Sequence, residues 1–237
     1  MSEIPCYTVY FAGGLFTQHD LTTNVLIKES VWRQSYGKFE LILPQSKELG
    51  RLDSSDMAAM TRNSDLFQAF KNDIILARFD GLEIDTGTLV EFMFAKFLGK
   101  PAVILRTDSR GFGIENMEEP YNLMVKNWPR TVEIHFDSLI NYLDKFSETM
   151  KNFNQDSSIE SKIKSEVETA MKGVDEIARQ IILGVDKVLQ MESPYPESYQ
   201  ELVYQAARYC PGCGFELLIS EFEIKKIIER FREIGTL

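Results

Sequence analysis

The sequence predicts an α/β protein, built on an open, doubly wound sheet of five mostly parallel strands and followed by a helical C-terminal extension. Over the first 150 residues, short apolar segments alternate about five times with segments of helical periodicity. The strand-like segments are mostly apolar, as expected when helices cover both faces of a parallel sheet. Beyond about residue 155 the pattern becomes helical only. We therefore expect an α/β domain over residues 1–152 and a helical extension over residues 157–237.

Five short runs of mainly β-branched, aliphatic and aromatic residues are the predicted strands. They are residues 7–12, 39–43, 73–77, 102–105 and 132–136. Gly13 and Gly14 follow the first run and Pro44 follows the second, and residues of these types commonly end strands.

Helical periodicity within the first domain predicts helices at residues 54–70, 86–98 and 139–150. Gly99 directly follows the second of these segments and fits a helix C-cap. These helices complete the strand–helix alternation of a doubly wound sheet.

A polar linker at residues 152–158 opens the extension, and Ser157 and Glu160 have the spacing of a capping box. Apolar residues then recur every three, four or seven positions, which predicts an amphipathic helix of about 30 residues, bent at Gly173 or Gly184. Two shorter helices are predicted at residues 198–208 and 221–234. We expect this tail to serve packing or oligomerisation.

The composition excludes several classes of function. The chain has 237 residues, with 26 Lys and Arg against 36 Asp and Glu, a formal charge of −10. Such an acidic chain is poorly suited to nucleic-acid polymers and to anionic membrane surfaces, which bind Lys and Arg patches. No apolar run approaches the length of a spanning helix, and the first residues do not read as a signal peptide. We expect a cytoplasmic protein.

Cysteine and histidine content argues against a metal cofactor. Three cysteines cannot form a disulfide framework and suggest a reducing compartment. His19 and His135 are the only histidines, too few for a multi-histidine metal centre. Cys210 and Cys213 form a single CxxC, which supplies two of the four ligands of a zinc ribbon. A zinc shared between two chains and a redox pair remain open, but a Pro-Gly turn with free thiols is favoured. No metal or organic cofactor is expected.

In doubly wound sheets, ligands bind beyond the carboxyl ends of the strands. The candidate segments are therefore residues 13–16, Gln45, 79–85 and 106–110. Within the third, Asp85 begins a predicted helix and has an ordinary N-cap role available. Glu91 interrupts an apolar stretch, where a carboxylate is costly unless it is paired or used. A partly exposed helix carboxylate remains the other interpretation of Glu91.

Taken together, several motifs resemble the nucleoside 2-deoxyribosyltransferase family over about residues 5–150. Tyr-Phe-Ala-Gly-Gly-Leu-Phe at residues 10–16 is similar to the family's N-terminal signature. Residues 65–99 resemble its central motif, with Asp-Thr-Gly-Thr-Leu-Val-Glu at residues 85–91, followed by Gly-Lys-Pro. Residues 106–110 and 121–124 resemble the loops that follow.

The resemblance implies a role for each matching residue. Glu91 would be the nucleophile that attacks C1′ of a 2′-deoxynucleoside, and Tyr10 would hold and tune it. Asp65 would pass a proton to the leaving base, and Asp85 would bind sugar hydroxyls. The other interpretations are a helix-surface acid for Asp65 and core packing for Tyr10.

Further substrate contacts follow from the same resemblance. Gln45 would bind the base, unless it lies in a solvated turn, and Asp80 is a candidate in the loop after the third strand. Gly13 and Phe16 would line the pocket, and Asn122 would reach the 5′ end of the sugar. In compact relatives a neighbour's C-terminal tyrosine completes the site, so we expect a homodimer or larger assembly with small-molecule substrates. The tail offers four tyrosines: Tyr195, Tyr199, Tyr204 and Tyr209.

Two other functions stay open. The first is an N-glycosidase of 2′-deoxynucleoside 5′-monophosphates, a hydrolase of the same superfamily that carries extra Ser and Arg groups after the first strand. Here that stretch is Gly-Gly-Leu-Phe-Thr-Gln, which favours an unphosphorylated substrate, although Arg106 and Arg110 could still bind phosphate. The second is a non-catalytic nucleotide-sensing module whose helical tail carries the function.

Overall fold

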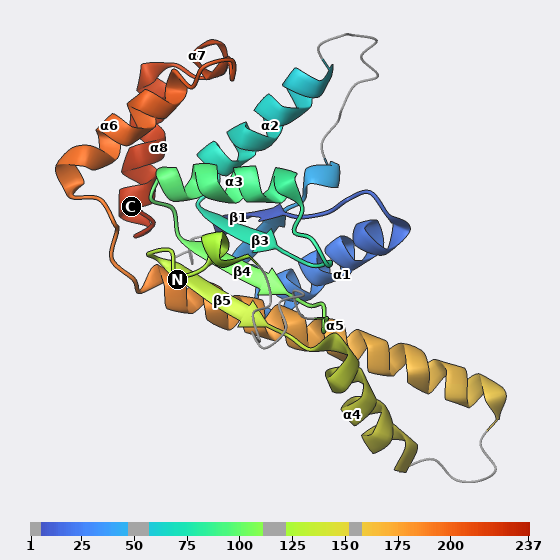
Figure 1. The fold of residues 1–237 in the computed structure, drawn as a ribbon. Coiled ribbons are helices and arrows are strands. Elements are labelled where there is room, and N and C mark those ends of the chain that lie inside the picture. Colours follow the sequence, from blue (N-terminus) through green and yellow to red (C-terminus); the bar gives the residue numbers. More distant parts are fainter. Residues whose placement is uncertain (1–5, 47–56, 111–121, 152–157) are drawn as a thin grey trace.

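The computed structural model describes residues 6–46, 57–110, 122–151 and 158–237. Its centre is a sheet of five strands in the order β2-β1-β3-β4-β5, and every neighbouring pair is parallel (Figure 1). The strands are β1 (Tyr7–Ala12), β2 (Phe39–Ile42), β3 (Ile74–Arg78), β4 (Ala102–Arg106) and β5 (Thr131–His135). The predicted doubly wound α/β fold is confirmed.

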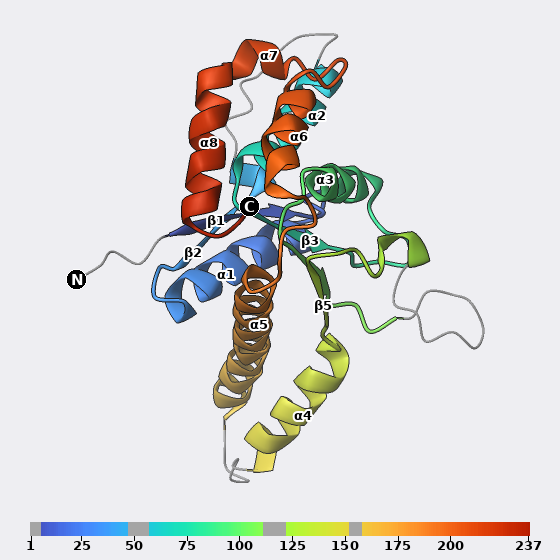
Figure 2. The same cartoon turned by 90° about the vertical axis from the view of Figure 1, so that its left-hand side faces the viewer.

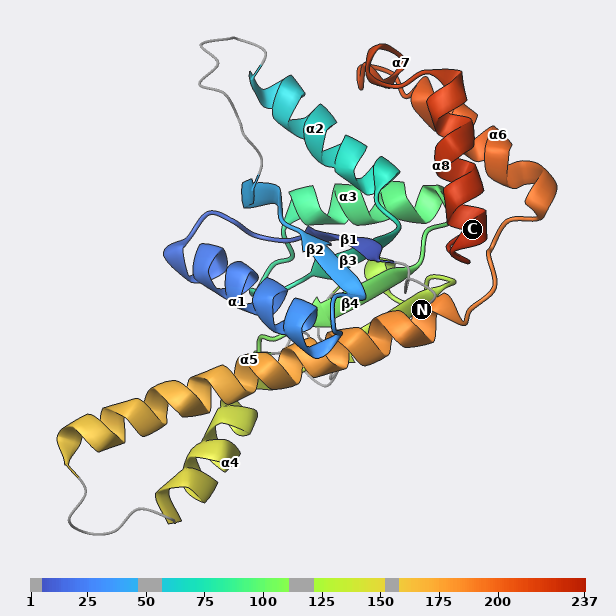
Figure 3. The same cartoon turned by 180° about the vertical axis from the view of Figure 1, so that it is seen from behind.

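Helices cover both faces of this sheet. On one face, α1 (Gln18–Gln34) lies beside the long α5 (Ile159–Leu189), as Figure 3 shows. The opposite face carries α2 (Met57–Lys71) and α3 (Thr86–Phe97). Each face has its own apolar core, because alternate residues of β1 and β3 point to opposite sides.

Helix α1 was not predicted from the sequence. Its buried face contains Asn24 and Ser30 as well as Ile27 and Val31. The polar members break the apolar periodicity that identifies a surface helix. A capping signal was nevertheless present, since Thr17 and Asp20 form a reciprocal capping box at the start of the helix.

Helix α5 is part of the α/β sandwich. It begins at Ile159 with Ser158 as its N-cap, and the predicted cap residue Ser157 lies outside the described residues. The helix continues unbroken through both glycines that were expected to bend it. At Gly184 an added Cβ would lie 2.9 Å from Ile134 Cδ1, so the glycine allows the helix to approach β5 closely. The first half of α5 lies beside α4 (Ser138–Lys151), away from the sheet (Figure 3).

The last helices form a separate layer against α2 and the end of α3 (Figure 2). They are α6 (Glu197–Arg208), α7 (Phe215–Leu218) and α8 (Glu221–Glu233). Phe70 of α2 packs edge-on against Tyr204, and Phe215 contacts the same phenyl ring at a centroid distance of 5.7 Å. The predicted tail helices are thus present, with α7 in addition, while the domain boundaries stay a prediction.

Two single turns of 3₁₀ helix complete the described chain, η1 (Pro44–Ser46) after β2 and η2 (Leu123–Val125) before β5. Across the described ranges, none of the helices combines the length and apolar character that crossing a bilayer requires.

Candidate active site

A tyrosine and a glutamate meet on the α3 side of the sheet. Tyr10 lies in β1 with no exposed surface, and its side chain points toward α3. Its hydroxyl donates a hydrogen bond of 2.8 Å to Oε1 of Glu91, which lies about a turn and a half into α3. Because β1 is a central strand and α3 packs across it, both groups are held on rigid elements.

Asp65 brings a second carboxylate to the same hydroxyl. It lies on α2, and its side chain also hydrogen-bonds Tyr10. Burial, followed by the charges of Glu91 and Asp65, raises the pKa of Tyr10 far above its ordinary value. The phenol therefore stays protonated. Its one proton lies in the hydrogen bond to Glu91.

A cleft of about 760 Å³ opens between α2 and α3 at this point. Asp65 and Glu91 both line it. The other lining residues are Met57, Ala58, Thr61, Arg62, Leu66, Thr86, Gly87 and Val90. The wall is mostly apolar with two convergent carboxyl groups, which is the usual character of a small-molecule site.

Asp85 caps the helix that carries Glu91. Its Oδ2 accepts hydrogen bonds from the backbone nitrogen of Thr88 at 2.7 Å and from the Thr88 hydroxyl at 2.8 Å. The carboxylate therefore occupies the positive end of α3. Gly87 allows this approach, because an added Cβ there would lie 3.1 Å from Asp85 Oδ2.

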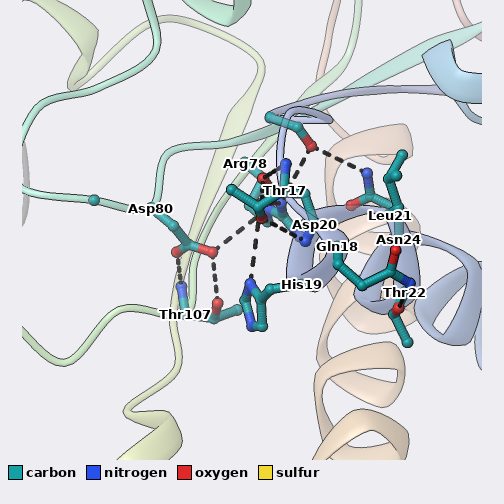
Figure 4. A network of polar contacts seen from close by, with 12 residues as sticks. Thr17, Gln18, His19, Asp20, Leu21, Thr22, Asn24, Arg78, Asp80 and Thr107 are labelled. Carbon is teal, nitrogen blue, oxygen red and sulfur yellow. Dashed lines mark hydrogen bonds and ion pairs between the residues drawn. The ribbon is translucent and has the colours of Figure 1, made fainter.

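On the other side of the strand ends, a polar network joins three loops (Figure 4). Asp80 accepts hydrogen bonds from the Thr107 nitrogen at 2.5 Å, the Thr107 hydroxyl at 2.6 Å and the Asp108 nitrogen at 3.0 Å. Arg78, which is 3% exposed, forms an ion pair of 2.8 Å with Asp20 at the start of α1. Burial opposes ionisation of Asp20, but hydrogen bonds from Thr17 and the Arg78 charge lower its pKa. The network fixes the loops after β1, β3 and β4 relative to one another.

Asp20 and Arg78 were not predicted from the sequence as parts of this edge. The available signal for Arg78 was a charged residue at the end of an otherwise apolar strand. No local pattern pairs it with Asp20, because 58 positions separate the two residues.

The structure gives the remaining predicted substrate contacts the following surroundings. Gln45 donates to the carbonyl of Leu21 and accepts from Asn24, so it binds α1. Phe16 is 81% exposed, and Gly13 packs against Arg78. Asn122 caps η2 by accepting from the Met124 nitrogen at 2.9 Å, while its neighbour Tyr121 lies outside the described residues. Their roles toward a substrate stay predictions.

Both candidate phosphate ligands have partners within the protein. Arg106 is buried and donates to the carbonyls of Phe79, Gly81 and Arg110 at 2.6–3.1 Å. Arg110 forms an ion pair of 2.5 Å with Asp108. Arg106 therefore supports the loop after β3, and Arg110 is tied to a carboxylate.

The tail tyrosines differ in exposure. Tyr195 donates a hydrogen bond of 2.8 Å to the carbonyl of Phe97 at the end of α3, and Tyr204 is buried in the tail core. Tyr199 and Tyr209 are more than half exposed. Whether one of them completes a neighbour's site stays a prediction.

The model of the nucleoside 2-deoxyribosyltransferase family matches residues 9–124. Over this segment, about half of its length, the chain is similar to that family. The segment contains Tyr10, Asp65, Asp85 and Glu91, whereas α4 to α8 lie outside it. The members of a deoxyribosyltransferase family act on small nucleosides, which agrees with the size and character of the cleft.

Two solved structures are similar to the chain. A conserved protein from Enterococcus faecalis V583 is 29% identical, with 54% of this chain and 92% of that chain covered and a TM-score of 0.42. A 2-deoxyribosyltransferase from the psychrotolerant bacterium Bacillus psychrosaccharolyticus is 20% identical, with 62% and 93% covered and a TM-score of 0.42. The comparison with curated proteins gives no match.

Proposed function

We propose that the protein exchanges the nucleobase of 2′-deoxyribonucleosides through a covalent deoxyribosyl–Glu91 intermediate. The observation that carries the proposal is the 2.8 Å hydrogen bond from Tyr10 to Glu91, beside Asp65, in a cleft large enough for a nucleoside. The match of residues 9–124 to the deoxyribosyltransferase family model supports the reaction class. The substrates would be a 2′-deoxynucleoside and a free base, and the assembly a homodimer or larger.

In the first half-reaction, a Glu91 carboxylate oxygen attacks C1′ and the bond from C1′ to the base nitrogen breaks. The bonding electrons leave with the base, which takes a proton from Asp65 and departs neutral. In the second half-reaction, the nitrogen of a new base attacks C1′, the ester bond breaks, and Asp65 recovers a proton. Two inversions give net retention, as in retaining glycosidases.

Tyr10 acts on the nucleophile without reacting. Its hydrogen bond fixes the orientation of the Glu91 carboxylate, so less reorganisation is needed at the moment of attack. Because the raised pKa keeps the phenol protonated, the donor is present at every ordinary pH. The absence of a 2′-hydroxyl in the substrate also favours the oxocarbenium-like transition state.

The position of Asp85 favours an unphosphorylated substrate. A helix N-terminus is a natural phosphate site, but here a carboxylate accepts its hydrogen bonds. Arg106 and Arg110 are likewise engaged with partners inside the protein. These contacts weigh against the nucleoside 5′-monophosphate hydrolase, which is the alternative reaction.

The test is to incubate the protein with deoxyinosine and free adenine and to separate the products by chromatography. Parallel reactions contain deoxyinosine alone or a deoxynucleoside 5′-monophosphate. We expect deoxyadenosine only in the first mixture. Glu91→Gln should reduce turnover on the order of 10³-fold or more while deoxyinosine still binds, because the amide lacks the nucleophilic charge. Glu160→Gln, which changes an exposed carboxylate on α5 that is not among the residues lining the cleft, is the matched control and should keep full activity.

Three outcomes would contradict this proposal. Base released only from the monophosphate would identify the hydrolase. Unchanged turnover in Glu91→Gln would remove the covalent mechanism, and no turnover of any nucleoside by the unaltered protein would favour a non-catalytic sensing module.

A further inference from the structure

The turn between α6 and α7 places two thiols against each other. The Cys213 thiol lies 2.9 Å from the Cys210 sulfur, and the Cys213 nitrogen donates to the Cys210 carbonyl at 3.0 Å, which closes the turn. Gly212 between them adopts a φ of 75°, a conformation that favours glycine. Both cysteines are free thiols. The turn therefore presents a preformed dithiol.

A metal is a poorer explanation of this pair. Among the described residues, no group of three or more Cys, His, Asp or Glu side chains could hold an ion. Zinc would need two further ligands, whereas a disulfide needs only the two sulfurs that already touch.

The same turn is bonded to the wall of the candidate cleft. The Gly212 carbonyl accepts hydrogen bonds from Arg62 Nη2 at 2.6 Å and Asn63 Nδ2 at 3.1 Å, both on α2. Arg62 and Asp65 line the cleft from this helix. Cys213 packs in one apolar cluster with Leu66, also on α2. The turn is therefore in direct contact with α2, and a change in its conformation would alter these contacts.

We propose that Cys210 and Cys213 are a redox-active pair, closed to an intramolecular disulfide by small disulfide compounds such as oxidised glutathione, and coupled to α2 through Gly212. The proposal is independent of the proposed base exchange.

The reaction is thiol–disulfide exchange. The half-buried Cys210, as thiolate, attacks one sulfur of oxidised glutathione, breaks its S–S bond and releases one glutathione thiolate. The Cys213 sulfur then attacks Cys210 in the mixed disulfide and releases the second glutathione. Two electrons and two protons pass from the protein to two glutathione molecules. Cys213 takes the second step because it is buried, whereas the partly exposed Cys210 is accessible to glutathione.

The disulfide should be easily reversed. Its loop would contain only four residues, so it would restrict the unfolded chain little and gain little stability from chain entropy. Weakly stabilised disulfides have more oxidising potentials and serve labile rather than structural roles.

The coupling to α2 has a measurable consequence. The two hydrogen bonds to Gly212 stabilise the reduced turn as the structure shows it. Removing one with Asn63→Ala should therefore raise the equilibrium constant for oxidation by about threefold to tenfold, by linkage. Gln68→Ala, on the same helix but bonded to Asn72 rather than to the turn, should leave the constant unchanged.

The experiment uses the full chain with Cys6→Ser, which removes the one other thiol. The protein is equilibrated in buffers of increasing oxidised-to-reduced glutathione ratio, its free thiols are alkylated, and intact mass is measured. We expect both cysteines to become protected together, with the loss of two hydrogen masses. Cys210→Ser should prevent closure, and Cys213→Ser should stop at the mixed disulfide.

Thiols that stay free in excess oxidised glutathione would overturn the redox pair, as would stoichiometric zinc bound through Cys210 and Cys213 in the purified protein. An equilibrium constant that is the same in Asn63→Ala and in the unaltered turn would overturn the coupling to α2. These outcomes do not depend on whether Cys213→Ser folds, since the Cys6→Ser protein alone decides the first two.

Discussion

At the scale of single residues, the site depends on a phenol buried between two acids. Tyr10 is surrounded by apolar residues of β1, β3 and α3, so its hydroxyl is kept away from water. A hydrogen bond to a charged group is worth about 1.5–3 kcal/mol in such surroundings. That energy holds Glu91 in a single orientation.

Tyr10→Phe tests this role. The ring keeps its shape and packing, but Glu91 loses its donor. We expect kcat to fall on the order of 10-fold to 100-fold, with a much smaller change in KM, since the hydrogen bond acts on the proposed nucleophile. Steady-state base-exchange rates give both constants.

Tyr7→Phe is the control for this substitution. Tyr7 lies in the same strand, but its hydroxyl donates to the carbonyl of Ile234, far from the cleft. Its activity should equal that of the unaltered protein. Equal losses in both variants would show that Tyr10 serves strand packing only.

At the scale of elements, the two halves of α5 have different neighbours. Its second half buries Ile177, Ile181 and Val185 against the sheet, and its first half lies beside α4. Two glycines lie in these two parts. Gly184 is buried against β5 and β4, while Gly173 faces only Asn141, 3.8 Å from an added Cβ.

The two glycines should therefore respond in opposite directions. Gly184→Val adds atoms where Ile134 Cδ1 is 2.9 Å and Val103 Cγ1 is 3.5 Å from the Cβ position, so overpacking should destabilise the protein by about 1–3 kcal/mol. Gly173→Ala meets no such contact and should stabilise it by about 0.5–1 kcal/mol through helix propensity.

Urea denaturation of both variants measures these changes in the free energy of unfolding. A stabilised Gly184→Val would show that α5 can move away from the sheet without cost, and the close approach would then have no structural importance.

At the scale of the whole molecule, the C-terminal layer is bonded to the amino ends of the strands. Arg230 of α8 pairs with buried Asp73 at 2.9 Å, and Arg130 donates to the carbonyls of Gly235 and Thr236. Lys100 is buried there, with its ammonium 4.2 Å from the centre of the Phe231 ring and its hydrogen bond to the Asn72 carbonyl. The tail thus covers the buried side chains of Arg130 and Lys100.

Two buried lysines make the free energy of unfolding depend on pH. Burial, with a contribution from Arg130, lowers the pKa of both Lys96 and Lys100 to about 7. Unfolded lysines keep a pKa near 10.4, so above pH 7 the unfolded chain binds more protons than the folded one. The free energy of unfolding should therefore rise between pH 7 and pH 9, by about 2 kcal/mol for each lysine.

Urea denaturation at pH 7, 8 and 9 measures this slope. The window ends near pH 9, because the raised pKa of Cys213 acts in the opposite direction above that value. Lys100→Met removes one titrating group and should roughly halve the slope. A free energy of unfolding that falls from pH 7 to pH 9 would show that these lysines stay charged in the folded protein.

The fold was largely readable from the sequence, because a buried parallel strand and a helix each have a local signature. The five strands were expected within one or two residues of their observed bounds, and α2 to α6 and α8 were also anticipated. Helix α1 was not, since its inward face includes Asn24 and Ser30 and so lacks the apolar stripe. The placement of Asp85 at the N-cap of α3 and of Glu91 within the same helix was likewise readable from local spacing.

The sequence by itself determined the alternation of elements, the acidic charge and the residues that match the family motif. Only the tertiary structure decided that Tyr10 and Asp65 meet, that Gln45 binds α1, and that the Cys210–Cys213 turn lies on α2. The physical reason is distance along the chain. Periodicity and capping are set by neighbours within a few positions, whereas these contacts join segments tens of residues apart through strand order and helix packing.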